Sequence, residues 1–453
     1  MVLKSTNPFT NKLIEEFEEV PEAALQEKLN RSLLAFEEWK RSDFIHRKLL
    51  MNNAAAILTE NIAVFAATIT AEMGKPVSES RAEVEKCAWV CNYYADNGEQ
   101  FLKPDNIVTD AYQSYVCYEP LGPVLGIMPW NFPFWQVFRF AAPALMAGNS
   151  VLLKHASNVQ GCARHIENIF IKSGFPKELF TNLVIGSARI GNIIGHDAVK
   201  AVSLTGSEAA GEKVAEAAGR NLKKSLLELG GSNAFVVLED ADIEKAAITG
   251  ARARMMNAGQ SCIAAKRFIV HTKISDRFIK LFVDQLNKLK SGDPADPETT
   301  IGPLASVQQA EAVEIQVKKS VDMGARIIHG GTRTNAFYSP TILINVKPGM
   351  AVFEEEVFGP VAPVIIAGDA REAITLANQT KFGLGVSVFT NDLEKAKRLV
   401  SEFRDGAVFI NELVKSDPRL PFGGTGRSGY GRELAVQGIR EFVNVKTVCI
   451  KKL

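Results

Sequence analysis

Cys262 is the cysteine of the sequence that is best placed for chemistry. It lies in the segment NAGQSCIAA, between a predicted helix and a predicted strand, where small and polar neighbours leave its sulfur open to approach. Cys449 lies instead inside an apolar alternating run, the usual setting of an unreactive thiol, and that structural role is the more common one for any cysteine. A nucleophilic thiolate would need an activating base and donors for the charge that develops on its substrate.

Two other side chains could supply that donor and that base. Asn131 lies in the turn MPWNFPFW, which follows the apolar strand PVLGIM and is made rigid by Pro129 and Pro133. A rigid turn can hold an amide donor with little reorganisation, although capping of the next helix is the more common role of such an Asn. Glu228 ends the apolar strand KSLLE before two glycines, which suits a general base or an exposed strand-end carboxylate.

A further segment could bind phosphate groups. SLTGSEAAG reads as a strand, a glycine turn and a helix around Gly206, Ser207 and Gly211, so that backbone N–H groups at the helix N-terminus could meet a pyrophosphate. The segment does not follow the GxGxxG pattern and is weak evidence by itself. Lys154 ends the strand SVLLK, where it could bind a ribose or a phosphate, or simply be solvated.

These candidates depend on an alternation of strands and helices. Residues 21–103 have apolar side chains at helical spacing. Between residues 123 and 228, five apolar strands alternate with helices, which predicts an α/β class with a doubly wound, Rossmann-like sheet. A second α/β block follows. The alternating run VNVKTVCI near the end reads as a lone strand, which must pair with the SYVCYE ribbon or with another subunit.

Composition excludes several classes of function. Lys and Arg number 52 and Asp and Glu 51, so the net charge of +1 argues against a nucleic-acid or polybasic membrane surface. No apolar run is long enough to span a bilayer, and the polar first residues predict no secretory signal. Six scattered cysteines without a CxxC pair indicate a reduced, cytoplasmic compartment. Six histidines without HxH or HxxxH spacing predict no metal site.

Taken together and in this order, the motifs resemble those of the aldehyde dehydrogenase superfamily over nearly the whole chain. The resemblance rests on PWNFP (129–133), LLK (152–154), TGS (205–207), LELGG (227–231), GQSC (259–262), EEEVFGPV (354–361) and PFGGTGRSGYGREL (421–434). It implies that Cys262 is the nucleophile and that Glu228 is the general base. It also implies that Asn131 and the backbone N–H of Cys262 form the oxyanion hole.

The resemblance further implies a nicotinamide dinucleotide cofactor. The residues expected to bind it are Trp130, Lys154, Ser157, Gly206, Ser207, Gly211, Glu356 and Phe358. Within this set, Lys154 would bind the adenine ribose, Ser207 the pyrophosphate and Glu356 the nicotinamide ribose. Phe358 would lie against the nicotinamide ring, although an acidic run such as residues 354–356 is ordinarily a solvated surface.

Ser157, three residues after Lys154, indicates the preferred form of that cofactor. Relatives that prefer NAD commonly carry a Glu at this place, and a carboxylate there would repel the 2′-phosphate of NADP. Ser157 is neutral and small, so Lys154 could pair with the phosphate. The sequence therefore predicts that NADP is accepted and preferred over NAD.

The substrate prediction rests on Arg139 and Ser416. Arg139 lies on an otherwise apolar helix, where it could reach solvent or bind an acid. The chain is most similar to the short bacterial succinate-semialdehyde dehydrogenases, in which an Arg and a Ser at these places bind the substrate carboxylate. The second Arg of that group is Met256 here, and its second active-site cysteine is Ala264. The resemblance thus implies oxidation of succinate semialdehyde to succinate.

The resemblance also implies a division of the chain and a homodimer or homotetramer. Residues 1–107 and 124–228 would form the cofactor-binding domain and residues 229–428 the catalytic domain. Residues 108–123 and 429–453 would form a small β oligomerisation element.

Three alternative functions remain open at this point. The enzyme could accept aliphatic or aromatic aldehydes broadly, with Phe134, Trp135 and Phe138 lining an apolar tunnel. The chain could be a catalytically idle structural protein, although Asn131, Glu228 and Cys262 together argue against that. It could also pass an acyl group to phosphate or coenzyme A, whereas Glu228 favours water.

Overall fold

A six-stranded sheet forms the first block and confirms the predicted Rossmann-like alternation. The computed structural model describes residues 2–452. The sheet order is β19-β9-β8-β5-β6-β7, with all neighbours parallel except β19. Its strands are β5 (Pro123–Met128), β6 (Ser150–His155), β7 (Phe180–Asn182), β8 (Ala201–Thr205), β9 (Lys224–Glu228) and β19 (Gly429–Tyr430). The order reverses between β5 and β8, and their carboxyl ends are where such sheets bind ligands.

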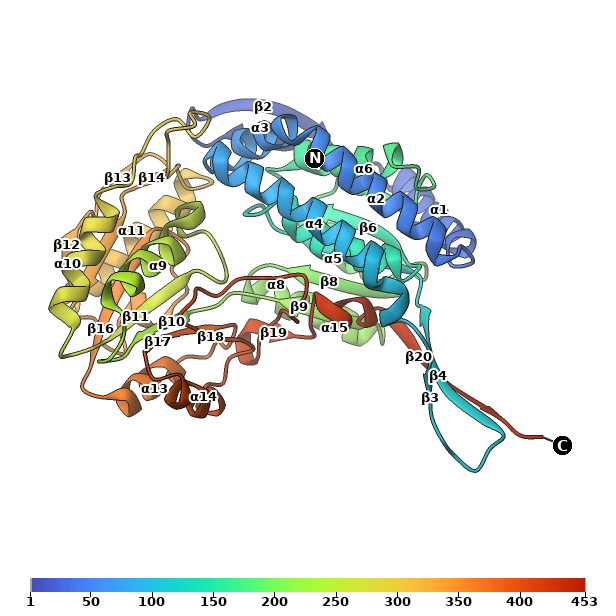
Figure 1. Cartoon of the computed structure of the whole chain (residues 1–453). Coiled ribbons are helices and arrows are strands. Elements are labelled where there is room, and N and C mark those ends of the chain that lie inside the picture. Colours follow the sequence, from blue (N-terminus) through green and yellow to red (C-terminus); the bar gives the residue numbers. More distant parts are fainter. Residues whose placement is uncertain (1, 453) are drawn as a thin grey trace.

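Helices cover both faces of this sheet (Figure 1). The connecting helices are α5 (Trp135–Met146), α6 (Gln160–Lys172), α7 (Ile190–Gly195) and α8 (Glu208–Arg220). The helical region expected at 21–103 is confirmed as α1 (Glu22–Trp39), α2 (Phe44–Glu60), α3 (Ile62–Met73) and α4 (Val77–Phe101). Every residue of β5, β6 and β8 is buried, because helices cover both faces, and the polar side chains of β6 and β8 are therefore buried as well.

A seven-stranded sheet forms the second block. Its order is β12-β15-β16-β11-β10-β17-β18, and only β12 is antiparallel to its neighbour. The strands are β10 (Asn233–Val237), β11 (Ala265–His271), β12 (Arg326–His329), β15 (Thr341–Ile344), β16 (Val361–Ala367), β17 (Val386–Phe389) and β18 (Val408–Ile410). The longer helices of this block are α9 (Ile243–Met255), α10 (Ser275–Leu286), α11 (Val307–Asp322), α13 (Ala370–Asn378) and α14 (Leu393–Leu399).

An N-terminal hairpin, β1 (Val2–Asn7) and β2 (Lys12–Glu18), was not expected from the polar opening of the sequence. Its turn depends on Asn7, whose Oδ1 accepts from the backbone N–H groups of Phe9 and Thr10. Asn11 takes the left-handed backbone conformation that asparagine tolerates, with a φ of 54°. Local turn chemistry rather than an apolar pattern therefore forms this hairpin.

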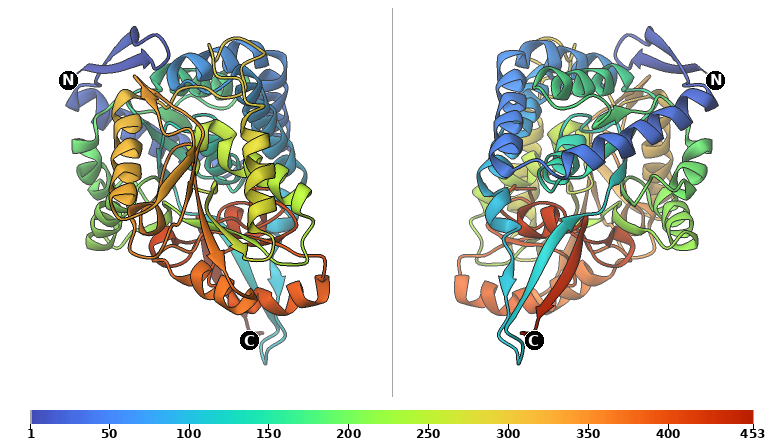
Figure 2. Two further views of the ribbon diagram at one scale, coloured as in Figure 1. Left: turned by 90° about the vertical axis from the view of Figure 1, so that its left-hand side faces the viewer. Right: turned by 90° about the vertical axis from the view of Figure 1, so that its right-hand side faces the viewer.

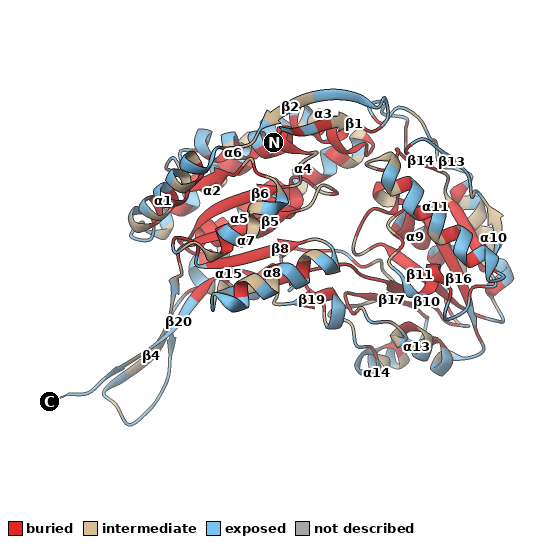
Figure 3. Cartoon of the chain, turned by 180° about the vertical axis from the view of Figure 1, so that it is seen from behind, coloured by how far each residue is buried: buried red, intermediate tan, exposed pale blue. Residues whose placement is uncertain are grey.

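A β extension projects from the first block (Figures 1 and 2). It contains β3 (Asp105–Asn106), β4 (Gln113–Pro120) and β20 (Val443–Ile450), in the order β20-β4-β3. The pairing of β20 with β4 confirms one of the two partners expected for the terminal strand. Most of the extension is exposed (Figure 3), and β20 pairs along only one of its edges within residues 2–452.

The extension begins later in the chain than residue 429. Gly429 and Tyr430 pair with β9 of the first sheet, and α15 (Ala435–Arg440) packs on α4 and α5. Gly429 allows this because its φ is 102°, and a Cβ there would lie 2.1 Å from the carbonyl oxygen of Leu227. Of the residues that follow Gly429, only those from Val443 onward leave the first block and join the extension.

No single helix within residues 2–452 combines the length and apolar content needed to cross a membrane. Taken together, the consecutive helices α2 and α3 are long and apolar enough by length and composition, but the angle between them is 72°.

Candidate active site

The structure brings Cys262 and Glu228 into contact, as expected. Cys262 lies in the turn before β11 of the second block, and Glu228 is the last residue of β9 in the first. The Sγ of Cys262 is 3.6 Å from the Oε2 of Glu228, and Glu228 is 1% exposed. A thiol and a buried carboxylate at this distance can exchange a proton, so the pair can form a nucleophile.

A strained loop carries Cys262 to this place. Asn257 and Ala258 have φ values of 52° and 49°, in the left-handed region, which asparagine tolerates but alanine rarely adopts. Gly259 follows with a φ of 74°, and a Cβ there would lie 2.3 Å from the carbonyl oxygen of Gly359. The backbone N–H of Asn257 donates to the Oε2 of Glu79 at 2.8 Å, which anchors the loop to α4.

Asn131 belongs to the same loop network. Its Nδ2 donates to the carbonyl oxygen of Gln260 at 3.1 Å, and its own carbonyl accepts from the Nδ2 of Asn257 at 2.8 Å. An amide has a second N–H, and the backbone N–H of Cys262 has no hydrogen-bond partner among residues 2–452. The alternative role as a helix cap is wrong, since α5 has no side-chain cap and Glu83 accepts from its first N–H groups instead.

His155 holds the turn that carries Asn131. Burial lowers the pKa of His155 to about 4, so its ring is neutral. Its Nδ1 accepts from the backbone N–H of Ala156 at 3.0 Å, and its Nε2 lies 2.8 Å from the carbonyl oxygen of Pro133. The Nδ1 also lies 3.1 Å from the carbonyl oxygen of Met128, so the ring lies between the end of β5 and the turn at Pro133 and ties the turn to the end of β6.

The surroundings raise the pKa of both reacting groups. Burial raises the pKa of Glu228 to about 7; the charge of Arg139 opposes this, and that of Glu433 adds to it. Burial also raises the pKa of the Cys262 thiol well above its usual range, and the nearby Glu228 carboxylate adds to the shift. Arg139 and Lys266 act in the opposite direction on the thiol.

Arg139 lies directly behind Glu228. It is 1% exposed, its Nε lies 2.5 Å from the Oε2 of Glu433, and its Nη2 lies 3.5 Å from the Oε2 of Glu228. Its Nη2 also donates to the hydroxyl of Thr205 at 3.2 Å. Much of its charge is thus committed to protein carboxylates, and its contact with a substrate acid stays a prediction.

Two of the three aromatic residues that the broad-specificity alternative places along an apolar tunnel lie in the core instead. Phe134 and Phe138 are fully buried and stack on each other, and Phe138 stacks in turn on Phe170 of α6. Their spacing of four residues places both on the core-facing side of the chain at α5. Phe134 and Phe138 are therefore core residues and do not line a tunnel, whereas Trp135 faces a lysine of α4.

The residues expected at the adenosine and pyrophosphate surround the switch point of the first sheet. Lys154, at the end of β6, is buried, and no carboxylate among residues 2–452 lies within 4.0 Å of its Nζ. Burial lowers its pKa, which a bound anion would counteract. Ser157 lies in the turn after β6. Ser207 caps α8 and is exposed between Gly206 and Gly211, so the first N–H groups of the helix face outward, as a pyrophosphate requires.

The residues expected at the nicotinamide are also brought together. The rings of Trp130 and Phe358 meet edge to face with centroids 5.8 Å apart. The Oε1 of Glu356 accepts from the backbone N–H of Gly231 at 3.1 Å. A Cβ at Gly230 would lie 2.2 Å from the Oε2 of Glu356, so only glycine admits this carboxylate. These residues fit the cofactor that the resemblance implies.

Lys266 was not expected in the site. Its Nζ is 2.8 Å from each of three oxygens: the carbonyls of Ser261 and Cys262 and the Oε1 of Glu356. It thereby joins the nucleophile loop to the expected ribose-binding carboxylate. The only indication in the sequence is the basic pair Lys266–Arg267 in a strand that is otherwise apolar, and both side chains are buried.

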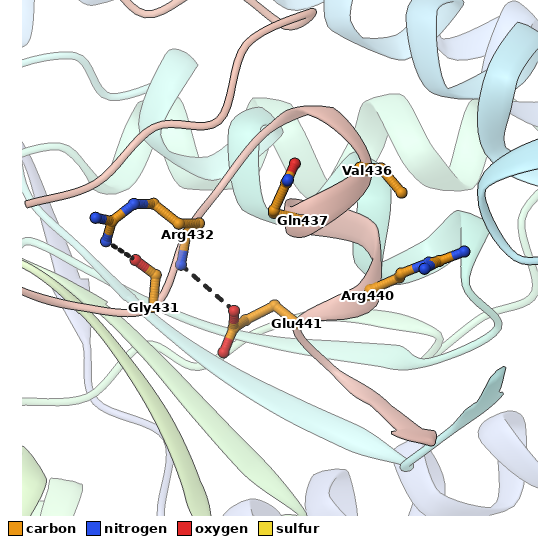
Figure 4. A pocket seen from close by; sticks show the side chains of 6 residues that line it. All are labelled: Gly431, Arg432, Val436, Gln437, Arg440 and Glu441. Atoms are coloured by element: carbon orange, nitrogen blue, oxygen red, sulfur yellow. Dashed lines mark hydrogen bonds between the residues drawn. The ribbon is translucent and has the colours of Figure 1, made fainter. Parts of the chain in front are cut away.

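Two surface hollows are lined mostly by residues that were not expected in the site. One of about 390 Å³ lies against α15 and is lined by Gly431, Arg432, Val436, Gln437, Arg440 and Glu441, none of which is an expected site residue (Figure 4). A second, of about 620 Å³, lies between the N-terminal hairpin and the start of α11. Trp130 and Asn158 line part of it, next to the expected cofactor residues.

The chain is similar to known proteins over its whole length. A model of the aldehyde dehydrogenase family matches residues 1–448. The probable succinate-semialdehyde dehydrogenase (NADP(+)) of Synechocystis sp. is 46% identical over 453 residues, covering 99% of this chain and 100% of the relative. The succinate-semialdehyde dehydrogenase (NADP(+)) of Mycobacterium avium is 45% identical, covering 99% and 97%. The structure of succinic semialdehyde dehydrogenase from Streptococcus pyogenes, in complex with NADP+, is 37% identical with a TM-score of 0.97, covering 99% and 100%.

Replacement of Lys266 tests its effect on the thiol. Lys266→Met keeps the length of the side chain and removes a charge that lowers the pKa of Cys262. Alkylation of Cys262 by iodoacetamide at neutral pH should slow by about threefold to tenfold, because one pKa unit changes the thiolate fraction about tenfold. Peptide mass spectrometry follows Cys262, with exposed Cys449 as an internal reference. An unchanged rate at Cys262 would contradict the assignment.

Proposed function

The chain belongs to the aldehyde dehydrogenase family, and from this premise we propose that it oxidises succinate semialdehyde to succinate with NADP as the preferred electron acceptor. One observation carries the proposed chemistry, the contact between the Sγ of Cys262 and the Oε2 of Glu228. The thiol has a base beside it, and the base is buried enough to hold or release a proton near neutral pH.

The first half of the proposed reaction forms a covalent adduct. Glu228 takes the proton of the Cys262 thiol at Oε2, and the resulting thiolate attacks the aldehyde carbon. The free N–H of the Asn131 amide and the backbone N–H of Cys262 donate to the oxyanion that forms. The product of this half is a thiohemiacetal on Cys262.

The second half releases the acid. The chemistry that a nicotinamide dinucleotide supplies when bound is two-electron oxidation, for which Glu356 and Lys154 would hold its two riboses. Oxidation leaves the acyl group on Cys262 as a thioester. Glu228, after releasing the thiol proton to solvent, takes a proton from a water molecule that attacks this thioester. The bond to sulfur breaks, the carboxylic acid leaves, and Glu228 returns its proton to the Cys262 thiolate.

Two side chains support an acidic substrate. Arg139 lies behind the catalytic pair, and the buried Ser416 contacts Lys86 of α4. The names of the Synechocystis and Mycobacterium relatives, at 46% and 45% identity, support the same substrate. The apolar tunnel of the broad-specificity alternative has little support, because Phe134 and Phe138 are core residues.

The assembly and location are proposed on separate grounds. The unpaired edge of β20 supports a homodimer or homotetramer in which the β extension pairs across a subunit boundary. All six cysteines are unpaired, which supports a reducing cytoplasmic compartment.

An aldehyde panel tests the proposed function. The expected kcat/KM for succinate semialdehyde exceeds that for butanal, a neutral aldehyde of the same chain length, by at least about 100-fold, or about 2.7 kcal/mol. Equal values for the two aldehydes would refute the acid specificity while leaving the dehydrogenase intact.

The raised pKa of Glu228 predicts an acid limb in the pH profile. Because the protonated carboxyl cannot accept a proton, kcat should fall as the pH drops through about 7. Glu228→Gln should lower kcat by about 10²–10⁴-fold and abolish that limb. Steady-state rates across the range, with unfolding monitored at each pH, make the measurement. The same limb in Glu228→Gln would assign it to another group.

Ser157→Glu tests the cofactor preference. The new carboxylate should repel the 2′-phosphate and reduce kcat/KM for NADP by at least about tenfold, while NAD changes little. Ser157→Ala is the matched control and should keep the preference for NADP. A parental enzyme that favours NAD by more than about tenfold would reverse the assignment.

A further inference from the structure

Lys86 lies on α4 close to the residues expected to bind the substrate acid. Its Nζ donates to the Oγ of Ser416 at 2.8 Å and lies 4.2 Å from the ring centroid of Trp135, the first residue of α5. These contacts direct the ammonium toward the first turn of α5, away from solvent. Three residues earlier on α4, Glu83 holds the N–H groups at the start of the same helix.

This ammonium has no carboxylate partner. Among residues 2–452, no carboxylate oxygen lies within 4.0 Å of the Nζ of Lys86. The two nearby acids are already committed, since Glu83 pairs with buried Lys75 and Asp417 pairs with Arg419. Arg139 differs from Lys86 because Glu433 and Glu228 share its charge. Of Arg139 and Lys86, the cation without a counter-charge is therefore Lys86.

Ser416 is also set to receive an acid. Its Oγ accepts from Lys86, and among residues 2–452 its hydroxyl proton has no acceptor. A serine hydroxyl that accepts one hydrogen bond can still donate one. The ammonium and this hydroxyl together thus present two donors, the arrangement that a carboxylate binds.

Electrostatics around Lys86 favour the same ligand. Burial, together with the neighbouring charge of Arg139, lowers the pKa of Lys86 to about 8. A bound carboxylate would offset both effects. The charge of Arg139 acts on the pKa of Lys86 and also on those of Cys262 and Glu228, and its Nη2 lies 3.5 Å from the Oε2 of Glu228.

We propose that Lys86 is a specificity-determining residue, whose ammonium binds the substrate carboxylate together with the hydroxyl of Ser416. The inference rests on the proposed function and names the cation that receives the acid. The substrate spans from its aldehyde at Cys262, past Arg139, to its carboxylate at Lys86. Lys86 supplies from α4 the second positive charge that Met256 does not supply from the nucleophile loop.

Paired substitutions separate this role from a structural one. Lys86→Met should lower kcat/KM for succinate semialdehyde by at least about 30-fold, mainly through KM, because a charge-assisted contact is lost. The kcat/KM of this variant for butanal should stay within about threefold of the parental value. Lys86→Arg should keep most of the activity toward the acid. Lys103→Met, on the exposed surface, is the matched control and should change neither value.

The possible outcomes decide between the two proposals. If the parental enzyme does not favour any carboxylated aldehyde over butanal, the proposed function fails and this inference fails with it. If the parental enzyme favours the acid but Lys86→Met lowers both substrates equally, Lys86 is structural and only this inference is overturned. Lys86→Gln keeps a donor for Ser416 and serves if the methionine variant does not fold; it should show the same split between substrates.

Discussion

The contact between Cys262 and Glu228 is the interaction on which the rest of the site depends. It brings together two blocks of the chain at a distance of 3.6 Å. Two buried carboxylates, Glu228 and Glu433, share the single guanidinium of Arg139, and Glu433 lies closer to it by 1.0 Å (3.5 against 2.5 Å). Burial raises the pKa of Glu228 to about 7, and the shared charge of Arg139 offsets only part of this rise while Glu433 adds to it. The base is thereby able to exchange protons near neutral pH.

The fold makes this contact by bringing the strand ends of the first sheet to the loop that carries Cys262. The carboxyl ends of β5, β6, β8 and β9 deliver Asn131, Lys154, Ser207 and Glu228 to one edge of the first sheet. The nucleophile comes from the other block on a loop with three left-handed residues, which hydrogen bonds from Asn257 anchor to Glu79 and Asn131. Lys266 then joins this loop to Glu356, so that the backbone carbonyl of Cys262 and the expected cofactor carboxylate share one buried cation.

Much of this arrangement could be predicted from the sequence. The strand–helix alternation predicted the Rossmann-like sheet, and the order of its strands explains why Asn131 and Glu228 meet Cys262. Such predictions succeed where period and motif carry the information. The counter-ion of Arg139 was not predictable, because Glu433 belongs to a loop near the end of the chain and only tertiary pairing brings it to α5.

Other features escaped prediction for local reasons. Lys86 follows an acidic stretch of an amphipathic helix, where a lysine ordinarily faces solvent. Phe134 and Phe138 belong to an aromatic run whose core-facing side is set by packing on α6. The start of the β extension depends on Gly429, whose close approach to Leu227 has no counterpart in the apolar pattern.

The central claim is that the acyl group passes through the sulfur of Cys262, and that Glu228 then directs water to it. Glu228→Gln incubated for hours with succinate semialdehyde and NADP should accumulate a thioester, because the thiol can still lose its proton to water and form the adduct slowly, whereas hydrolysis of the thioester has lost its base. Intact-mass and peptide mass spectrometry should then find one succinyl group per chain, on the peptide that contains Cys262. Cofactor reduction in that variant with no adduct on Cys262, or with the acyl group on another residue, would contradict the account.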